Sequence, residues 1–264
     1  MSEAAIMMLV PFLRGYSFVW RPTISADATN WVLYSQAIAA GWDGVVPLDA
    51  EVTVSSGIVL SANSTSLYGF DTGTGFPAGT TLKLIMPGYV CGMGGKGGNG
   101  AVGSPTAGDA GGPALRAQHA ITIDATGGVI AGGGGGGGGG DGRYSGNPSG
   151  GGGGGRTGRT GSPAGTSDGG YAAVDGTFSS GGQGGGGTTT PGGGTGGTTS
   201  PGGNGSAGES RAWGGGGGGW GAAGGKGGRS GGGSGASGGP GGAAVVGNSY
   251  ITWINTGTRY GAIT

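Results

Sequence analysis

Nine consecutive glycines, Gly132 to Gly140, are the feature that most restricts how this chain folds. A segment without side chains has little apolar surface to bury, so the hydrophobic effect does not hold it in a folded state. Only nine of the 81 glycines precede Tyr89, and further glycine runs follow at 150–155, 184–187, 192–194 and 214–219. The distribution predicts a small ordinary domain over residues 1–88 and a glycine-rich domain over residues 89–264.

The glycine runs alternate with segments that carry large aromatic side chains. A flexible linker is the usual interpretation of such low complexity, but aromatic residues spaced through it indicate positions that are held. Glycine also forms extended left-handed helices with three residues per turn, which pack side by side as the strands of collagen do. Amide hydrogen bonds and Cα–H···O contacts between such helices then replace a hydrophobic core. We therefore predict a sandwich of packed polyglycine type II helices, ordered from about residue 92 to residue 247.

A three-residue pattern of small side chains supports this prediction. From Gly218 to Gly242, every third residue is no larger than serine, while Lys226 and Arg229 fall in a different phase. Such a helix packs on its small sides and exposes its remaining side to solvent. The pure glycine run at 132–140 has no such restriction, and we expect it in the middle of the lattice.

The first 88 residues predict a small α+β domain, so the fold class is mostly β and irregular. A helix is expected over 26–40, with Asp27 as its N-cap and Gly41 as its left-handed C-cap. Strands are expected at 51–55, 57–60 and 80–86 because their side chains alternate or are β-branched. Residues 120–124 and 128–131, joined by a short turn, predict a β-hairpin within the glycine region.

Charge and composition exclude several classes of protein. The net charge is zero and 9% of residues are charged. The chain therefore lacks the excess of basic residues that a nucleic-acid-binding protein normally has. Cys91 is the only cysteine and is expected to be a buried thiol. His119 is the only histidine, which leaves nothing for a Ser–His–Asp relay or a multi-histidine metal site, so we expect no enzyme activity, no cofactor and no metal. The N-terminus lacks a signal-peptide pattern and no segment is long enough to span a membrane, which favours synthesis in the host cytoplasm.

Three blocks of sequence resemble the glycine-rich adhesins at the tips of bacteriophage tail fibres: residues 92–100, residues 121–140 and residues 213–228. The resemblance covers about residues 88–247. It implies a receptor-binding protein of the virion, carried at the tail or tail-fibre tip, that binds an outer-membrane protein or a surface glycan of the host. In such adhesins a polyglycine sandwich presents loops to the receptor, and an N-terminal domain docks on the fibre.

Carried onto this chain, the resemblance places receptor loops at 141–149, 156–180, 188–201 and 204–213. Aromatic side chains dominate interface energetics, and arginine pairs with carboxylates or phosphates. The expected receptor-binding residues are Arg143, Tyr144, Arg156, Arg159, Tyr171, Phe178, Trp213 and Trp220. Two alternatives stay open: the aromatic residues cap the glycine lattice internally, and the arginines are solvated loop charges.

The N-terminal domain has its own dense set of aromatic residues. They either fill a small core or bury against a carrier protein, and the expected attachment residues are Phe12, Phe18, Trp20, Trp31 and Trp42. Two further functions compete with that of an adhesin. A glycine-rich structural or ice-binding protein would share the helix type, and a glycan-cleaving tail enzyme would need paired acids, for which Asp109, Asp141, Asp168 and Asp175 are candidates.

Overall fold

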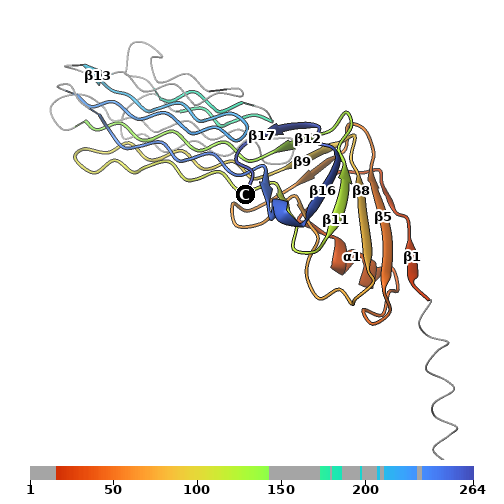
Figure 1. The fold of residues 1–264 in the computed structure, drawn as a ribbon. Coiled ribbons are helices and arrows are strands. Elements are labelled where there is room, and N and C mark those ends of the chain that lie inside the picture. The colour runs from red at the N-terminus through yellow and green to blue at the C-terminus, as the bar shows by residue number, and fades with distance from the viewer. Residues whose placement is uncertain are drawn as a thin grey trace, which may run out of the picture.

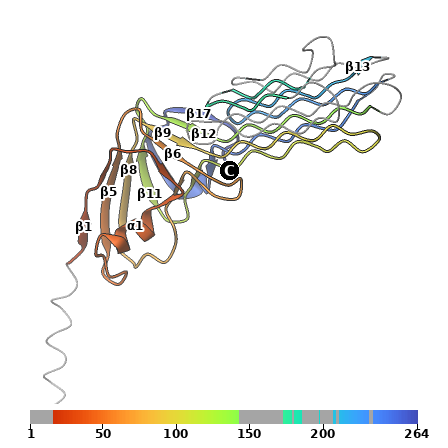
Figure 2. The ribbon, with the colours of Figure 1, turned by 180° about the vertical axis from the view of Figure 1, so that it is seen from behind.

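The protein consists of a wedge of parallel strands from which a bundle of extended glycine-rich segments projects, as both views show (Figures 1 and 2). The structure, a computed structural model, describes residues 16–142, 173–178, 180–185, 197, 207–208, 211–230 and 234–264. It is mostly β, with one short α-helix in the part of the chain described.

Within these residues, three sheets of parallel strands build the wedge. Sheet A joins, in order, β1 (Phe18–Trp20), β5 (Leu48–Val54), β8 (Thr81–Ile85), β11 (Ile121–Asp124) and β16 (Ile251–Asn255), with β2 (Thr23–Ile24) also beside β5. Sheet B joins β3 (Ala28–Thr29), β6 (Val59–Ser61), β9 (Tyr89–Cys91), β12 (Val129–Ala131) and β17 (Thr258–Tyr260). Sheet C joins β4 (Trp31–Val32), β7 (Phe70–Asp71), β10 (Leu115–Arg116) and β15 (Val245–Val246).

The chain visits sheets A, B and C in the same order again and again, which defines a three-faced β-solenoid. The first rung contributes β1 to β4 and the second β5 to β7; the last rung contributes β16 and β17 and ends with Ile263, which bridges to Val245. Along β5 the buried residues Leu48, Ala50, Val52 and Val54 alternate with partly exposed ones. This period of two turns one face of each strand toward a core shared by the three sheets.

The helix is shorter than its sequence pattern predicts. α1 spans Leu33–Ala39, and the residues expected to form its first turns instead pair with sheets B and C through β3 and β4. Asp27 does not cap the helix, because its Oδ1 accepts a hydrogen bond from the N–H of Val59. Gly41, with a φ of +100°, confirms the predicted left-handed position after the helix.

The predicted hairpin at 120–131 is wrong. β11 lies in sheet A and β12 lies in sheet B, and each pairs in parallel with strands of the neighbouring rungs. Gly127, with a φ of +74°, turns the corner between the two faces instead of reversing the chain within one sheet. Alternation and a glycine turn are common to a hairpin and to a solenoid corner, so local sequence does not separate them.

The glycine-rich segments are insertions at one corner of this solenoid. Residues 92–114 connect β9 to β10, and residues 132–244 connect β12 to β15, so both leave sheet B and return to sheet C. Strands on both sides of Tyr89 share the same sheets. The glycine content changes near residue 89, whereas the sheets continue across that position.

Backbone hydrogen bonds join the glycine segments with a repeat of three residues. The N–H groups of Gly95 and Gly98 donate to the carbonyls of Gly134 and Gly137, each at 2.8 Å. In turn, the N–H groups of Gly133, Gly136 and Gly139 donate to the carbonyls of residues 112, 109 and 106, and those of Gly135 and Gly138 to the carbonyls of residues 222 and 225. The nine-glycine run also accepts bonds from segments 215–221 and 236–242, so it lies in the middle of the lattice, as predicted.

Close approach of backbone to backbone explains why these positions are glycine. A Cβ atom added to Gly136 would lie well inside 3.0 Å of the Lys96 carbonyl, a separation that real Cβ atoms essentially never show. The same holds for Gly133 against Met93 and Gly139 against Asn99, one three-residue step away on either side. The face of the run is closed to every other residue type.

The described segments alternate in direction, which gives the lattice two ends. Segments 92–101, 132–141 and 222–228 bond in parallel, while 106–112, 215–221 and 236–242 run the opposite way. We call the end beside the solenoid proximal and the far end, where β13 (Ala207–Gly208) lies, distal (Figure 1). The turns that join these described segments therefore lie at one of two ends.

Candidate receptor-binding end

The distal end gathers the turns that lie farthest from the solenoid. In the described chain these are residues 102–105 and the antiparallel pair of β13 and β14 (Arg211–Ala212), with Asp141 and Ser230 beside them at the ends of their segments. Five of the predicted receptor-binding residues fall outside the described residues: Arg143, Tyr144, Arg156, Arg159 and Tyr171. The described part of this end consists mainly of the bases from which the loops leave.

The short loop 102–105 is a distal feature that the glycine pattern did not reveal. Thr106 closes it, because its N–H donates to the Asn99 carbonyl at 2.9 Å and its Oγ1 accepts from the Asn99 N–H at 2.7 Å. Val102 leaves the lattice at this point and is 60% exposed. The available signal was Pro105, which interrupts the glycine repeat of residues 92–100.

Asp141 ends the nine-glycine run and is buried, with 1% of its surface exposed. Its Oδ1 accepts the N–H of Gly103 at 2.8 Å, and its Oδ2 lies 3.2 Å from Nε of Arg229. The Asp141 backbone also bonds to Gly228 and Ser230. One side chain therefore touches the ends of two other glycine segments.

Trp213 lies at the distal end of its segment, but its ring is buried, with 6% of the residue exposed. Its carbonyl accepts the N–H of Gly228 at 2.6 Å. A buried ring offers little surface to a receptor. The sequence left two interpretations open, a receptor contact and an internal cap on the glycine lattice. The burial of Trp213 fits the internal cap.

Phe178 and Trp220 lie at the proximal end. The chain reverses at 177–180, where the Thr177 N–H donates to the Ser180 carbonyl, and again at 220–221, where Gly221 has a φ of +63°. The two rings pack against each other with centroids 5.6 Å apart, and the Trp220 Nε1–H donates to the Phe178 carbonyl at 2.6 Å.

These two rings cover the outer face of sheet B. Val59, Cys91 and Ala131 form the buried floor beneath them, with Tyr89 and Tyr260 alongside. Phe178 and Trp220 therefore join the glycine lattice to the solenoid, and segment 156–180 does not lie wholly in a distal loop. Cys91 is a buried thiol, as predicted.

The described N-terminal aromatic residues differ in exposure. Trp31 and Trp42 are 7% and 2% exposed; Trp31 stacks between Trp20 and Phe70, and the Trp42 indole donates to the Val46 carbonyl. Phe18 and Trp20 are half-buried on the first rung, whose outer edge has no further described strand beside it. Phe12 lies outside the described residues.

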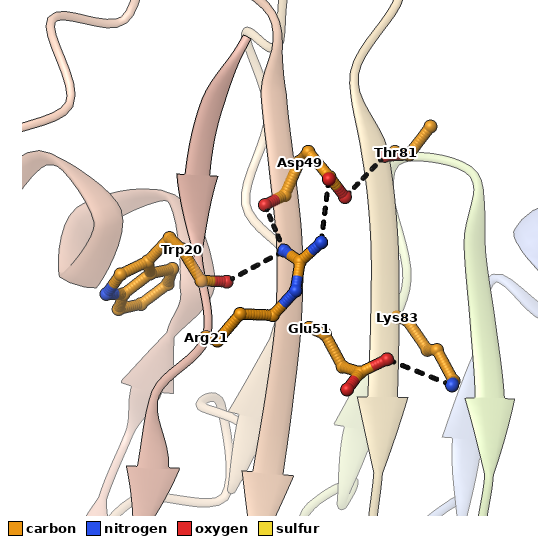
Figure 3. A network of polar contacts seen from close by, with 6 residues as sticks. All are labelled: Trp20, Arg21, Asp49, Glu51, Thr81 and Lys83. Atoms are coloured by element: carbon orange, nitrogen blue, oxygen red, sulfur yellow. Dashed lines mark hydrogen bonds and ion pairs between the residues drawn. The ribbon is translucent and has the colours of Figure 1, made fainter.

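The outer face of sheet A carries a ladder of paired charges around a shallow groove of about 400 Å³ (Figure 3). Arg21 bonds Asp49 at 2.6 Å, Thr81 donates to the other oxygen of Asp49, and Lys83 lies 2.9 Å from Glu51. The hydrogen bond from Arg21 is the main cause that lowers the pKa of Asp49. Each carboxylate of the groove is therefore paired with a cation.

Fold and site together define a class: an elongated β protein that carries turns at the far end of a glycine-built scaffold. Residues 20–264 match the family model of the phage tail fibre adhesin Gp38. The chain belongs to this family, which is a family of adhesins and not of enzymes. It is a tail-fibre adhesin.

One solved structure is similar in fold. It is the gp37-gp38 adhesin tip complex of the long tail fibre of bacteriophage S16, with a TM-score of 0.60 and 21% sequence identity over 94% of this chain and 82% of that chain. The search of curated proteins found no match. None of the helices in the described ranges has the length and apolar character needed to cross a membrane.

Proposed function

We propose that the distal end binds a receptor on the bacterial outer surface, an outer-membrane protein or a surface glycan, and that the solenoid docks on the tail-fibre tip. The observation that carries this proposal is the alternation of the glycine segments, which brings loop 102–105, Asp141 and the β13–β14 pair together at one end, far from the solenoid. A rigid scaffold with loops at one end is a common arrangement for recognition.

The scaffold itself is best explained as packed polyglycine type II helices. The hydrogen bonds of the central run to each of five neighbouring segments repeat every three residues, which fits a helix with three residues per turn. Each bond contributes only about 0.5–1.5 kcal/mol, so stability depends on their number and on the exclusion of side chains. Such a lattice holds loops in place without a hydrophobic core.

Docking is assigned to the first rung of the solenoid. β1, β3 and β4 are the outermost described strands of sheets A, B and C, and open strand edges pair readily with another chain. Phe18 and Trp20 add half-buried aromatic surface, and Val19 is 61% exposed. The similar S16 structure is a complex of two tail-fibre proteins, which supports a fibre protein as the carrier and the virion as the location.

The test separates the two ends by mutation in phage particles that carry this chain. Tyr144→Ala and Tyr171→Ala are expected to slow adsorption to susceptible cells roughly thirtyfold, the effect of losing one anchor residue, with normal incorporation into tails. Val19→Glu is expected to prevent incorporation, while the purified variant chain still binds cells. If both tyrosine variants adsorb normally and Val19→Glu abolishes cell binding, the ends are assigned the wrong way round.

A further inference from the structure

Beyond the loops themselves, one buried side chain joins the bases of three distal turns. Asp141 stands where the nine-glycine run ends, and its two carboxylate oxygens hold different segments, Gly103 on one and Arg229 on the other. These partners are 38 and 88 residues away along the chain. We propose that Asp141 is the positioning residue of the receptor-binding end, setting where loop 102–105 and the chain after Arg229 lie relative to each other. The proposal rests on the proposed receptor-binding function.

The three-residue lattice explains why a side chain is used at this point. Up to Ala101 the segment is held by backbone bonds, the last of them from the Ala101 N–H to the Gly140 carbonyl at 3.2 Å. Two residues later Gly103 adopts a φ of +76° and has left the repeat. At that point the Asp141 carboxylate accepts a hydrogen bond from the Gly103 N–H. The side chain therefore anchors the loop to the lattice beyond the last backbone hydrogen bond of the repeat.

Arg229 contributes the opposite charge. The Asp141 side chain is 2% exposed and that of Arg229 is 34% exposed, so the pair connects the interior of the lattice to its surface. The backbone bridges from Ala101 to Asp141 and from Asp141 to Arg229 place the three residues side by side. A buried carboxylate needs such partners to remain charged, and the same partners fix the ends of their segments.

Adsorption and hydrogen exchange, measured on phage particles and on the purified full chain, test the proposal. We expect Asp141→Asn to slow adsorption about tenfold and to raise the exchange rate of the Gly103 amide at least tenfold. Gly133, Gly136 and Gly139, whose amides bond within the lattice, should keep wild-type exchange. Arg229→Lys retains a cation and should adsorb within about threefold of wild type, whereas Arg229→Gln should behave as Asp141→Asn does. Asp49→Asn, which breaks an exposed pair on the solenoid, is the matched control and should adsorb normally.

Three results would overturn the proposal: wild-type adsorption by Asp141→Asn, unchanged exchange at Gly103, or loss of protection throughout 133–139, which would make Asp141 a general stability element. Failure of the proposed function is distinguishable from these results. In that case Tyr144→Ala and Tyr171→Ala would also adsorb normally. If those variants lose adsorption and Asp141→Asn keeps it, only the positioning role is wrong.

Discussion

Carboxylate–arginine pairs recur on this molecule at different depths. The Asp71 side chain is 8% exposed and its pair with Arg116 is covered by the Tyr68 ring, whose centroid lies 4.4 Å from the guanidinium carbon. The hydrogen bond to Asp71 is the main cause that raises the pKa of Arg116. The Asp49 pair on sheet A is exposed by comparison, with side chains 39% and 44% accessible. Exposed pairs contribute at most about 1 kcal/mol each, whereas removing one partner of a buried pair costs several times more.

Replacing Arg21 by glutamine should raise the pKa of Asp49 toward its ordinary value of 3.8. A folded-state pKa below the unfolded one means that the pair adds stability above about pH 4 and that this stability is lost as the pH falls through the folded pKa. Because the pair is exposed, the change in the free energy of unfolding should stay below about 1 kcal/mol at pH 7. NMR titration of the Asp49 carboxyl in both proteins measures the shift, and an unchanged pKa would show that Arg21 does not hold the carboxylate in solution.

A single methyl group at Gly136 should disrupt the lattice. In Gly136→Ala the new Cβ meets the Lys96 carbonyl, and both segments are backbone with no flexible end to move aside. We expect loss of soluble protein or of protection at the amides of 133–139, measured by hydrogen exchange. Ala110→Val is the control, since Ala110 lies in a neighbouring glycine segment with its side chain exposed. Equal tolerance of both changes would contradict the close packing.

At the scale of elements, pairing between rungs overrides local preference. Residues 28–32 have the spacing of a helix start, yet they form β3 and β4 because β6 and β7 offer hydrogen-bonding edges beside them. The burial of the outer face of β12 likewise depends on segments that are distant in the sequence. Its residue Ala131 is fully buried although it points away from the core, because the turns that carry Phe178 and Trp220 cover it.

Trp220→Ala should weaken the joint between the lattice and the solenoid. Removing a buried indole costs about 3–5 kcal/mol, and this one also donates a hydrogen bond to Phe178. We expect a lower thermal midpoint, with normal adsorption at temperatures where the protein remains folded, because the ring lies at the proximal end. Tyr250→Ala, at a residue that is 50% exposed, should leave both properties unchanged. If the variant is fully folded but fails to adsorb, Trp220 contributes to receptor binding and this prediction is wrong.

At the scale of the whole molecule, two stabilising principles coexist in one chain. The main hydrophobic core draws on buried residues from Trp31 to Val90, from Ala114 to Ile130, and at 244–245. Of the glycine-rich insertions, only their last residues, Ala114 and Ala244, belong to that buried core. The two parts meet mainly at the cluster around Trp220 and through backbone bonds.

Excising the lattice should therefore leave a folded solenoid. Met93 and Gly112 are joined by a hydrogen bond of 2.6 Å, and Gly133 and Gly242 by one of 2.8 Å, so short Gly–Ser turns can close both gaps. We expect the shortened protein to unfold cooperatively on heating and to compete with the full chain for the tail-fibre tip, but not for cells. Failure to fold would show that the lattice supports the solenoid, and retained cell binding would move recognition away from the distal end.

The sequence predicted the central position of the nine-glycine run, the strands β5, β6 and β8, and the adhesin family. It did so because these depend on local properties: the absence of side chains, the alternation of buried residues and recurring glycine motifs. It missed the solenoid, since a corner between two sheets and a hairpin within one sheet have the same local pattern. It also missed the contacts of Asp141 with Gly103 and Arg229, which form only where distant segments end together.

The aromatic residues between the glycine runs show which features of the structure local sequence does not determine. Local sequence identifies Phe178, Trp213 and Trp220 equally as large side chains at the ends of glycine segments. The structure alone decides that Phe178 and Trp220 lie at the proximal end and Trp213 at the distal end. The reason is that each reversal of an extended segment carries the chain from one end of the lattice to the other, so the place of a residue depends on every reversal before it and on no property of its own.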